Sequence, residues 1–481
     1  MTLTMLTRAV PRAPLSLPLQ GSVRNDRDDI AARDCALKRD LAALSEKDAE
    51  FWSFKDNGSR EHTHAYFQYP AMMVPQMQGE LIRAIARVQP TARRILDPFV
   101  GSGTILAEAM MQGMDFVGLD INPLAVLLCR AKIAPFDDEA ATEQAHRLLE
   151  NIQNDKCEKV QVAFKGRDKW FRSDVQIGLS RVQRQIRCVE NVEMRRFFWV
   201  ALAETIRLSS NSRTSTYKLH TRPADEISSR CIDVPSSFQA ILTRNVENMG
   251  KQKAILAEND WLESGRYKGN IQIGLGDTRT DLAQGSNAVQ SDILVTSPPY
   301  GDNPTTVPYG QHSYLPLQWI DKDDVDPQFD DSFLESTHEI DSRSLGGRRK
   351  NALIECTSLF EMSPTFRTTL ELLKDEPVDR RSRLAGFCRD LEKCIDPILS
   401  QLRPNSYMVW TLGNRKVGGR IVPLDIILGE FMEARSATKV ASIDRKILSK
   451  RMASKNKFAA TMNAETLLVF RKASADAAHG T

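Results

Sequence analysis

Two short segments far apart in the sequence carry the residue types that could do chemistry. Residues 97–104 read Asp-Pro-Phe-Val-Gly-Ser-Gly-Thr, and residues 296–300 read Thr-Ser-Pro-Pro-Tyr. Each segment follows a short apolar run that is typical of a buried strand. The first has spaced glycines, which let a backbone approach a ligand closely. Because ligands bind at the carboxyl ends of strands in open α/β sheets, we expect both segments to serve one site.

The glycine turn argues against two kinds of phosphate site. A dinucleotide turn has a third glycine and a P-loop has a lysine, and Gly101-Ser102-Gly103-Thr104 has neither. A nucleoside ligand with no phosphate to bind remains, and Asp120 at the end of the next strand suits the two ribose hydroxyls. The alternative is a tight turn with Asp120 as a helix cap. The presence of both Asp97 and Asp120 favours nucleoside binding over this alternative.

The second segment offers hydrogen-bond acceptors beside an aromatic ring. Consecutive prolines fix the backbone and donate no hydrogen bonds, which leaves the Ser297 hydroxyl and the Pro298 carbonyl as acceptors. The lone pair of an exocyclic amine on a nucleobase is delocalised into the ring. If the amine donates both N–H protons to such acceptors, its lone pair points outward and can attack an electrophilic group in line. Positioning and electrostatics would supply this catalysis without a metal. The predicted catalytic residues are Ser297, Pro298, Pro299 and Tyr300, with Tyr300 stacked on the flipped base.

These two segments together resemble the motifs of a known family. Residues 97–104 are similar to the S-adenosylmethionine signature of class I methyltransferases, in the form common among DNA amino-methyltransferases, and Ser297–Tyr300 resembles their catalytic motif. The resemblance implies S-adenosylmethionine as the cofactor, with the glycine turn at the methionine part, Asp120 at the ribose and Asp277 at the adenine. The residues expected to bind it are Tyr69, Pro70, Asp97, Phe99, Gly101, Ser102, Gly103, Thr104, Asp120, Asn122 and Asp277.

The first residue of the catalytic motif bears on the base that is modified. Serine there is typical of the cytosine-N4 enzymes, whereas adenine-N6 enzymes more often carry Asp or Asn. The resemblance therefore implies a site-specific, restriction–modification type enzyme acting on cytosine N4 of double-stranded DNA, with adenine N6 as the alternative. A cognate restriction endonuclease and a cytoplasmic, nucleoid-associated, prokaryotic-type location are expected with it.

Two further alternatives are an RNA guanine-N2 methyltransferase and a non-catalytic DNA-binding subunit. The RNA enzymes share the turn, but their N-terminal RNA-binding module has no visible counterpart before Tyr66. Intact Asp97, Asp120 and Ser297–Tyr300 argue against a site that has lost its activity.

Composition sets broad bounds on the class of protein. The chain has 481 residues, a net charge of +3 and eight scattered cysteines without a CxxC pair, so we expect neither a disulfide framework nor a zinc site. No apolar run approaches the roughly 20 residues that span a bilayer, and no membrane partner is expected. The mild positive charge permits a nucleic-acid partner without requiring one.

The element pattern predicts an α/β fold, a seven-stranded, mostly parallel Rossmann-like methyltransferase sheet with two large, largely helical or loop insertions. The basic segment 137–270 is the first candidate for target recognition and the segment 302–380 is the second. The small polar residues of Ser209–Arg222 suit phosphate contacts. Within the second insertion, residues 321–341 are acidic and are predicted to form an exposed loop. The expected organisation is an N-terminal tail and helix (1–60), methyltransferase segments (61–136, 271–301 and 381–472), insertions (137–270 and 302–380) and a disordered tail (473–481).

Three further expectations concern segments beside these motifs. Residues 62–70 are predicted to be an extended aromatic stretch. After the catalytic motif, Thr305, Thr306, Tyr309 and Trp319 are expected to wall the base pocket. Residues 340–348 are similar to a segment found after the catalytic motif in related sequences, and the sequence gives no physical reason for it.

Overall fold

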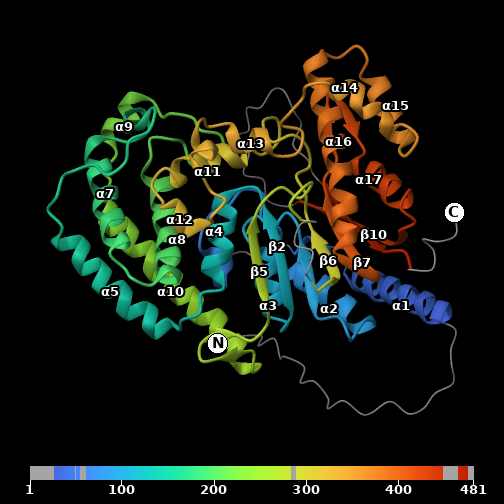
Figure 1. Cartoon of the computed structure of the whole chain (residues 1–481), viewed down its shortest axis with the longest axis horizontal. Coiled ribbons are helices and arrows are strands. Elements are labelled where there is room, and N and C mark those ends of the chain that lie inside the picture. The colour runs from blue at the N-terminus through green and yellow to red at the C-terminus, as the bar shows by residue number, and fades with distance from the viewer. Residues whose placement is uncertain (1–25, 49, 55–60, 283–288, 448–463, 475–481) are drawn as a thin grey trace.

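A seven-stranded sheet forms the centre of the molecule (Figure 1). The computed structural model describes residues 26–48, 50–54, 61–282, 289–447 and 464–474, so residues 1–25 and 475–481 of the predicted tails lie outside it. The strand order is β10-β11-β7-β6-β1-β2-β5, and β11 runs in the direction opposite to the other six of these strands. The predicted fold class is confirmed. The strands are β1 (Arg94–Asp97), β2 (Asp115–Asp120), β5 (Ile271–Leu275), β6 (Ser291–Thr296), β7 (Leu402–Leu412), β10 (Thr438–Lys446) and β11 (Ala464–Arg471).

Helices cover both faces of this sheet, and alternate strand residues point to opposite faces. Along β6, Ile293 and Val295 join the core under α1 (Asp26–Lys47), α2 (Pro75–Val88) and α3 (Thr104–Met110). Leu294, between them, joins the core under α16 (Val378–Ser400) and α17 (Leu424–Glu433). Since the strand is buried on both faces, it reads as a continuous apolar run.

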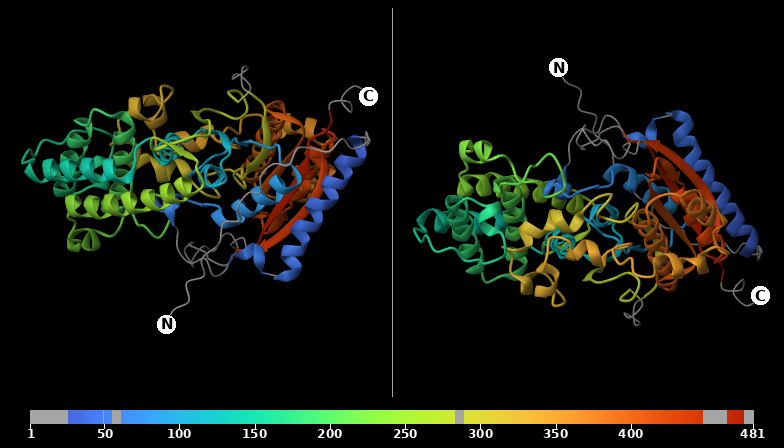
Figure 2. Two further views of the ribbon diagram at one scale, coloured as in Figure 1. Left: turned by 90° about the horizontal axis from the view of Figure 1, so that it is seen from below. Right: turned by 90° about the horizontal axis from the view of Figure 1, so that it is seen from above.

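The N-terminal helix α1 is fastened to the far end of the sheet. It lies along β10 and β11 in both views of Figure 2. The carboxylate of Asp34 accepts a hydrogen bond from the Tyr407 hydroxyl at 2.9 Å and pairs with Arg471 at 2.9 Å. The helix α1 and the strands β7 and β11 therefore belong to one structural unit.

The strand order reverses between β1 and β6, which pair in parallel through Ile95–Ile293 and Leu96–Leu294. From β1 the chain moves outward to β2 and β5, and from β6 it moves outward in the other direction to β7. The segments that follow β1 and β6 consequently leave the sheet side by side, at the position where open α/β folds bind their ligands.

The first insertion forms a helical lobe beside the sheet, shown in green in Figure 1. Its centre is α8, whose Phe197, Phe198 and Trp199 are fully buried. Helix α4 (Pro123–Lys132) packs against both α8 and β5 and joins the lobe to the sheet. The lobe contains α5 (Asp138–Asn154), α6 (Arg167–Trp170), α7 (Ser173–Arg187), α8 (Val192–Ser209), α9 (Ala224–Ser229), α10 (Val234–Glu258) and the hairpin β3 (Leu262–Glu263) with β4 (Arg266–Tyr267).

The second insertion is divided between the two sides of the molecule. Its first part packs against α8 of the helical lobe and against α4, and its later part packs against α16 and α17. The first part contains α11 (Tyr309–Leu317), α12 (Lys322–Val325), the 3₁₀ helix η3 (Asp331–Leu334) and α13 (Glu339–Arg343). The later part contains α14 (Ala352–Glu355), the 3₁₀ helix η4 (Cys356–Leu359) and α15 (Pro364–Leu372).

The acidic segment 321–341 is not an exposed loop, contrary to the prediction. Asp324 is buried and accepts hydrogen bonds from the Arg195 guanidinium at 2.6 and 2.8 Å and from the Trp199 indole at 2.7 Å. Asp326 pairs with Arg130 at 2.5 Å. Since these carboxylates bind arginines of the helical lobe and of α4, part of the basic excess of the first insertion is neutralised inside the molecule.

Other local expectations also fail where tertiary packing decides the conformation. The segment 62–70 begins with a 3₁₀ helix, η2 (His62–Ala65), rather than an extended strand. Trp319 is fully buried against Phe171, with ring centroids 5.6 Å apart, and does not wall the cavity described below. The polar residues 209–212 are buried, so they are not free to contact phosphates.

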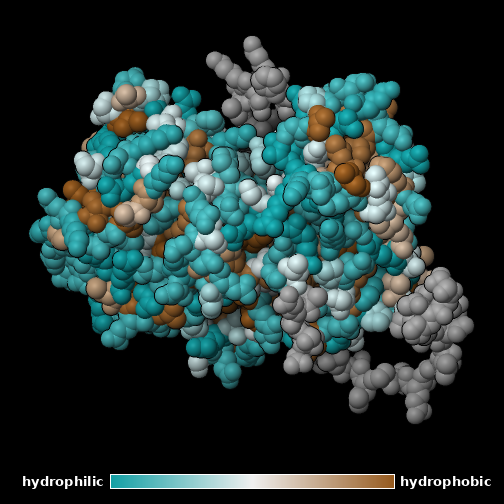
Figure 3. All heavy atoms as spheres, turned by 45° about the horizontal axis from the view of Figure 1, so that its top comes forward, coloured by the Kyte–Doolittle hydropathy of each residue, from teal (hydrophilic) through white to brown (hydrophobic). Residues whose placement is uncertain are grey.

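The surface of the molecule is largely hydrophilic, with some apolar patches. Hydrophilic residues cover most of the face shown in Figure 3, and an apolar patch lies on the side built by the C-terminal elements. Large exposed apolar side chains on that side include Ile354, Leu372, Val378 and Ile421. Among the described residues, no helix is long and apolar enough to cross a bilayer.

The buried pairing of Asp324 gives a stability prediction. Replacing Asp324→Ala leaves the Arg195 guanidinium and the Trp199 N–H without their buried acceptor, and we expect the free energy of unfolding to fall by about 3 kcal/mol. Urea denaturation followed by circular dichroism measures the change. The matched control is Asp323→Ala, since Asp323 is exposed, with an expected change below about 0.5 kcal/mol. Equal effects of the two substitutions would contradict the buried pairing.

Candidate active site

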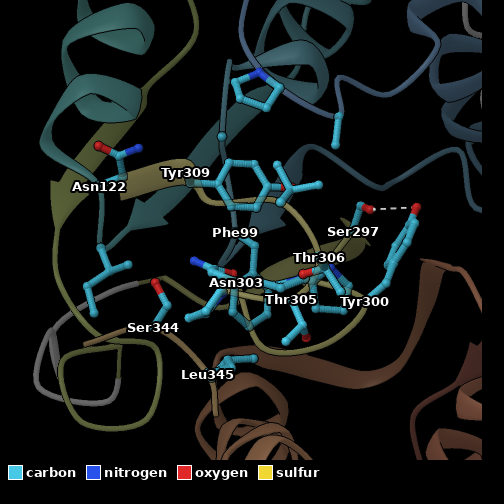
Figure 4. A pocket seen from close by; sticks show the side chains of 18 of the residues that line it. Phe99, Asn122, Ser297, Tyr300, Asn303, Thr305, Thr306, Tyr309, Ser344 and Leu345 are labelled. Carbon is cyan, nitrogen blue, oxygen red and sulfur yellow. Dashed lines mark hydrogen bonds between the residues drawn. The ribbon is translucent and has the colours of Figure 1, made fainter. Parts of the chain in front are cut away.

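A cavity of about 920 Å³ opens at the carboxyl ends of β1, β2, β5 and β6. Residues of both sequence motifs line it, and Figure 4 shows Phe99 together with Ser297 and Tyr300 around the same space. Of the predicted site residues, all except Asp97 and Gly103 line this cavity. The sheet thus brings together two segments that the sequence places far apart.

The two glycines of the first motif have different tasks. Both have positive φ, 51° at Gly101 and 71° at Gly103, which favours glycine. A Cβ on Gly101 would meet nothing nearer than the Tyr69 ring at 3.7 Å, so this backbone is open toward the cavity. A Cβ on Gly103 would lie 2.9 Å from the Cys129 sulfur. Gly103 therefore permits close packing of α4 rather than ligand contact.

Asp97 joins the two motifs to each other. Its carboxylate is fully buried and accepts hydrogen bonds from the Thr296 hydroxyl at 2.7 Å and from the Phe99 amide at 3.1 Å. Thr296 immediately precedes the catalytic motif, so this carboxylate links the end of β1 to the end of β6. Burial raises the pKa of Asp97 to about 7, against the opposing effect of these hydrogen bonds. Contrary to the prediction, Asp97 does not face the cavity.

Asp120 and Asn122 fix the wall of the cavity after β2. One oxygen of Asp120 accepts from the Gly101 amide at 2.8 Å and the other from the Asn122 amide at 2.9 Å. Burial raises the pKa of Asp120 to about 6 in spite of these bonds. A carboxylate can accept about four hydrogen bonds, so Asp120 keeps acceptor capacity for a further donor such as a ribose hydroxyl.

The side chain of Asn122 connects this wall to aromatic residues. Its amide donates to the Tyr69 hydroxyl at 2.9 Å and to the Ser313 hydroxyl at 2.8 Å. The Tyr69 ring stacks on Tyr309 with centroids 5.7 Å apart. Both tyrosines line the cavity, and Tyr309 extends across the centre of the view in Figure 4. These aromatic faces can hold a flat ligand ring.

Asp277, which follows β5, is already bound by an arginine. The guanidinium of Arg279 approaches both oxygens of Asp277 at 2.9 and 3.0 Å and also pairs with buried Asp390 at 2.9 Å. Arg279 lines the cavity as well. Arg279 is not among the residues predicted from the sequence, although the signal for it was a cation two residues after Asp277.

Residues of the catalytic motif form a chain of hydrogen bonds in the wall of the cavity that follows β6. The Ser297 hydroxyl lies 3.3 Å from the Tyr300 hydroxyl, and the Tyr300 hydroxyl donates to Glu465 of β11 at 3.1 Å (Figure 4 shows the first of these). Burial, followed by the charge of Glu465, raises the pKa of Tyr300 well above its ordinary value, so this hydroxyl remains protonated. Pro298 and Pro299 also line the cavity and bring no N–H donor to it.

The second insertion supplies much of the remaining wall, and two buried carboxylates hold it. Asp302 pairs with Arg383 at 3.1 Å and Arg415 at 2.9 Å. Asp341 accepts from the Gly310 amide at 2.8 Å and from the Asn303 amide at 3.0 Å. The physical task of segment 340–348 is therefore to anchor the chain that follows the catalytic motif. Thr305, Thr306 and Tyr309, which were expected in this wall, are confirmed as lining residues.

Comparisons with known proteins agree with this arrangement. A family model for DNA methylases of the N6/N4 type matches residues 26–129. The chain is 30% identical over 439 residues to the type II methyltransferase M.MvaI of Kocuria varians, covering 88% of this chain and 94% of that protein. It is 29% identical over 90 residues to the type II methyltransferase M.MjaII of Methanocaldococcus jannaschii, covering 19% of this chain and 16% of that protein.

The raised pKa of Asp97 predicts a pH dependence of stability. A carboxyl whose pKa rises from 3.8 to about 7 on folding favours the folded state while protonated, and this advantage is lost as the pH increases through about 7. In the variant Asp97→Asn this titration is absent. We expect the difference in unfolding free energy, wild type minus variant, to fall by at most about 1.4 kcal/mol per pH unit between pH 5 and 7.

Urea denaturation of both proteins between pH 5 and pH 9 measures this difference, and taking the difference cancels the other titrating groups. Above about pH 8 the difference should be constant. A difference that rises between pH 5 and pH 7 would contradict the account of Asp97.

Proposed function

The chain belongs to the type II DNA methyltransferases, whose methyl donor is S-adenosylmethionine, and we propose that it methylates cytosine N4 of a flipped base in double-stranded DNA. One observation supports this proposal above the others. Ser297 of the catalytic motif and Gly101 and Asp120 of the cofactor turn line the same cavity. The serine at the first motif position favours cytosine over adenine, and adenine N6 is the alternative base.

The residues around the glycine turn suit the methyl donor, which supplies a methyl group on a positively charged sulfur when bound. We assign the methionine part to the open backbone at Gly101 with Tyr69 beside it. The lone pairs left on Asp120 would accept the ribose hydroxyls, and Asp277, held by Arg279, would face the adenine. Asp97 and Gly103 do not line the cavity: Asp97 holds the turn through its hydrogen bonds, and Gly103 lets α4 pack closely against it.

The catalytic loop would act on the amine through its acceptors. The two N–H protons of the amine would be accepted by the Ser297 hydroxyl oxygen and the Pro298 carbonyl oxygen, which draws the nitrogen lone pair out of the aromatic ring. Since prolines at 298 and 299 have no N–H, the backbone offers no donor at these two positions. Catalysis then rests on positioning and on preorganised dipoles. The Tyr300 ring would stack on the base.

The two insertions have different relations to this cavity. Residues 303–307 and several residues between 340 and 383 of the second insertion and the start of α16 line it. From the first insertion, all of which is described, Lys218 alone lines it. We therefore assign the base pocket to the second insertion and contacts to the surrounding DNA to the helical lobe. A cognate restriction endonuclease and association with the nucleoid belong to the same proposal.

Two lysines are suited to the phosphates beside the flipped base. Lys218, from the loop after α8, and Lys416, from β8 (Arg415–Val417), both line the cavity and are exposed. Neither forms an ion pair with a described residue, in contrast to Arg383 and Arg415 nearby. Lys218 belongs to the helical lobe and Lys416 to β8, so a DNA strand entering the cavity would pass close to both.

The reaction itself is tested with labelled methyl donor. Purified protein and S-adenosyl-[methyl-³H]methionine are incubated with duplex DNA, single-stranded DNA or tRNA, and the nucleosides are identified by mass spectrometry. We expect label in duplex DNA as N4-methylcytosine. N6-methyladenine would replace the base in this proposal and leave the reaction class intact, whereas label confined to tRNA would overturn it.

Loss of the serine acceptor should separate catalysis from binding. For Ser297→Ala we expect the rate of single-turnover methyl transfer to fall about 100-fold or more, since one preorganised contact to the reacting amine is removed. The affinity for S-adenosylmethionine, measured by calorimetry, should stay within about twofold. Ser442→Ala, an exposed serine on β10, serves as the matched control and should retain full activity. Wild-type rates for Ser297→Ala would sink this mechanism.

Loss of each lysine should weaken DNA binding in a salt-dependent way. One phosphate contact contributes about 0.9 to the slope of log K against log salt concentration, so Lys218→Ala and Lys416→Ala should each reduce the slope by about one. Fluorescence anisotropy with a labelled duplex between 50 and 250 mM salt measures it. The control Lys38→Ala, at an exposed position on α1, should leave the slope unchanged. An unchanged slope for both cavity lysines would remove them from the DNA path.

A further inference from the structure

We infer that Glu465, on the last strand of the sheet, is a positioning residue for methyl transfer that acts through the hydroxyl groups of Tyr300 and Ser297. This inference rests on the proposed function, because it concerns how the same site presents its acceptor. Neither the two sequence motifs nor the residues that line the cavity include Glu465.

The carboxylate of Glu465 lies behind the catalytic loop and joins two parts of the fold. Its Oε1 accepts a hydrogen bond from the Tyr300 hydroxyl at 3.1 Å, and its Oε2 lies 3.1 Å from Nε of Arg445 on β10. Both side chains are mostly buried, with 17% of Glu465 and 7% of Arg445 exposed. Arg445 and Glu465 are also direct cross-strand partners in the β10–β11 ladder. The carboxylate is therefore held in place from the side opposite to Tyr300.

A carboxylate in this position fixes the direction of both hydroxyl groups. Because a carboxylate accepts and does not donate, the Tyr300 proton must point to Glu465. The Tyr300 oxygen is then free to accept, and the Ser297 hydroxyl lies 3.3 Å from it. This distance is long for two hydroxyls, as is common at catalytic sites before the substrate binds. The proton of Ser297 is thereby directed away from the cavity.

The direction of the Ser297 proton matters for the chemistry of an amine. A serine hydroxyl that turns its proton toward the cavity would donate to the amine nitrogen and occupy the lone pair that must attack. A hydroxyl that turns its proton toward Tyr300 presents only lone pairs, which can accept an N–H of the amine. Hydrogen bonds in such a chain also polarise one another, which makes the Ser297 oxygen a better acceptor.

A structural role for Glu465, through its ion pair with Arg445, predicts different results from a role through Tyr300. In Glu465→Gln the amide oxygen can still accept from Tyr300, but the charge that pairs with Arg445 is lost. In Glu465→Ala both interactions are lost. The strand ladder itself is formed by backbone groups from Ala464 to Arg471 and remains in either variant. The two variants therefore separate the hydroxyl chain from the ion pair.

The test compares single-turnover methyl-transfer rates of wild type, Glu465→Ala, Glu465→Gln, Tyr300→Phe and the double variant Glu465→Ala with Tyr300→Phe. We expect Glu465→Ala and Tyr300→Phe each to lower the rate about tenfold, the effect of one lost hydrogen bond. The double variant should be no slower than the slower single variant, because both remove the same chain. Glu465→Gln should recover most of the rate, and affinities for S-adenosylmethionine and DNA should be unchanged throughout.

Asp444→Ala provides the matched control on the same strand pair. Asp444 accepts a hydrogen bond from Thr466 at 2.9 Å, one position along the ladder from Arg445 and Glu465, and has no contact with Tyr300. Its rate should equal that of wild type. If Glu465→Ala does not fold, Glu465→Gln and Tyr300→Phe still decide the matter, since the inference requires the first to be active and the second to be impaired.

The possible outcomes distinguish this inference from the proposed function. Wild-type rates in Glu465→Ala, a Glu465→Gln variant as slow as Glu465→Ala, or a double variant about 100-fold slower than wild type would each overturn the role of Glu465. A wild-type protein that transfers no methyl group to DNA would overturn the proposed function instead. Methylation of adenine rather than cytosine would leave the role of Glu465 standing, because both bases present an exocyclic amine.

Discussion

The hydrogen bond between buried Asp97 and Thr296 is the interaction on which the site depends. It joins the last residue of β1 to the last residue of β6 at 2.7 Å, at the point where the strand order reverses. Burial raises the pKa of this carboxyl to about 7, so ionising it inside the fold costs free energy. This hydrogen bond fixes the turn that begins at Pro98 relative to the loop that begins at Ser297, since each follows one of the two bonded residues.

Buried carboxylate–arginine pairs extend the same construction outward. Asp302 holds the chain after the catalytic motif to Arg383 and Arg415, and Asp324 holds α12 to Arg195 of the helical lobe. Two large insertions can therefore surround a sheet of ordinary topology without disturbing its strand ends. Breaking such a pair leaves an uncompensated buried charge, which makes the placement of each insertion specific.

The sequence predicted most of the sheet and cavity because those signals are local. The apolar runs before Asp97 and Ser297, the glycine at 101 and the prolines at 298 and 299 each determine their own conformation. The failures involve distant partners. Asp324 looked exposed because Arg195 lies far away in sequence, and Trp319 looked like a cavity residue because its contact with Phe171 cannot be read from spacing. Glu465 was not predicted for the same reason, since Tyr300 contacts it only in the folded sheet.

The central claim is that this cavity methylates an exocyclic amine of a DNA base at a defined sequence. Its most direct test is single-molecule sequencing of genomic DNA from a methylation-deficient bacterial host that expresses the protein. The same host expressing the Asp120→Ala variant serves as the comparison. The account predicts N4-methylcytosine at nearly every copy of one short sequence motif, and none in the comparison host. Genomic DNA without new methylated bases, or with methyl groups on cytosine C5, would contradict it.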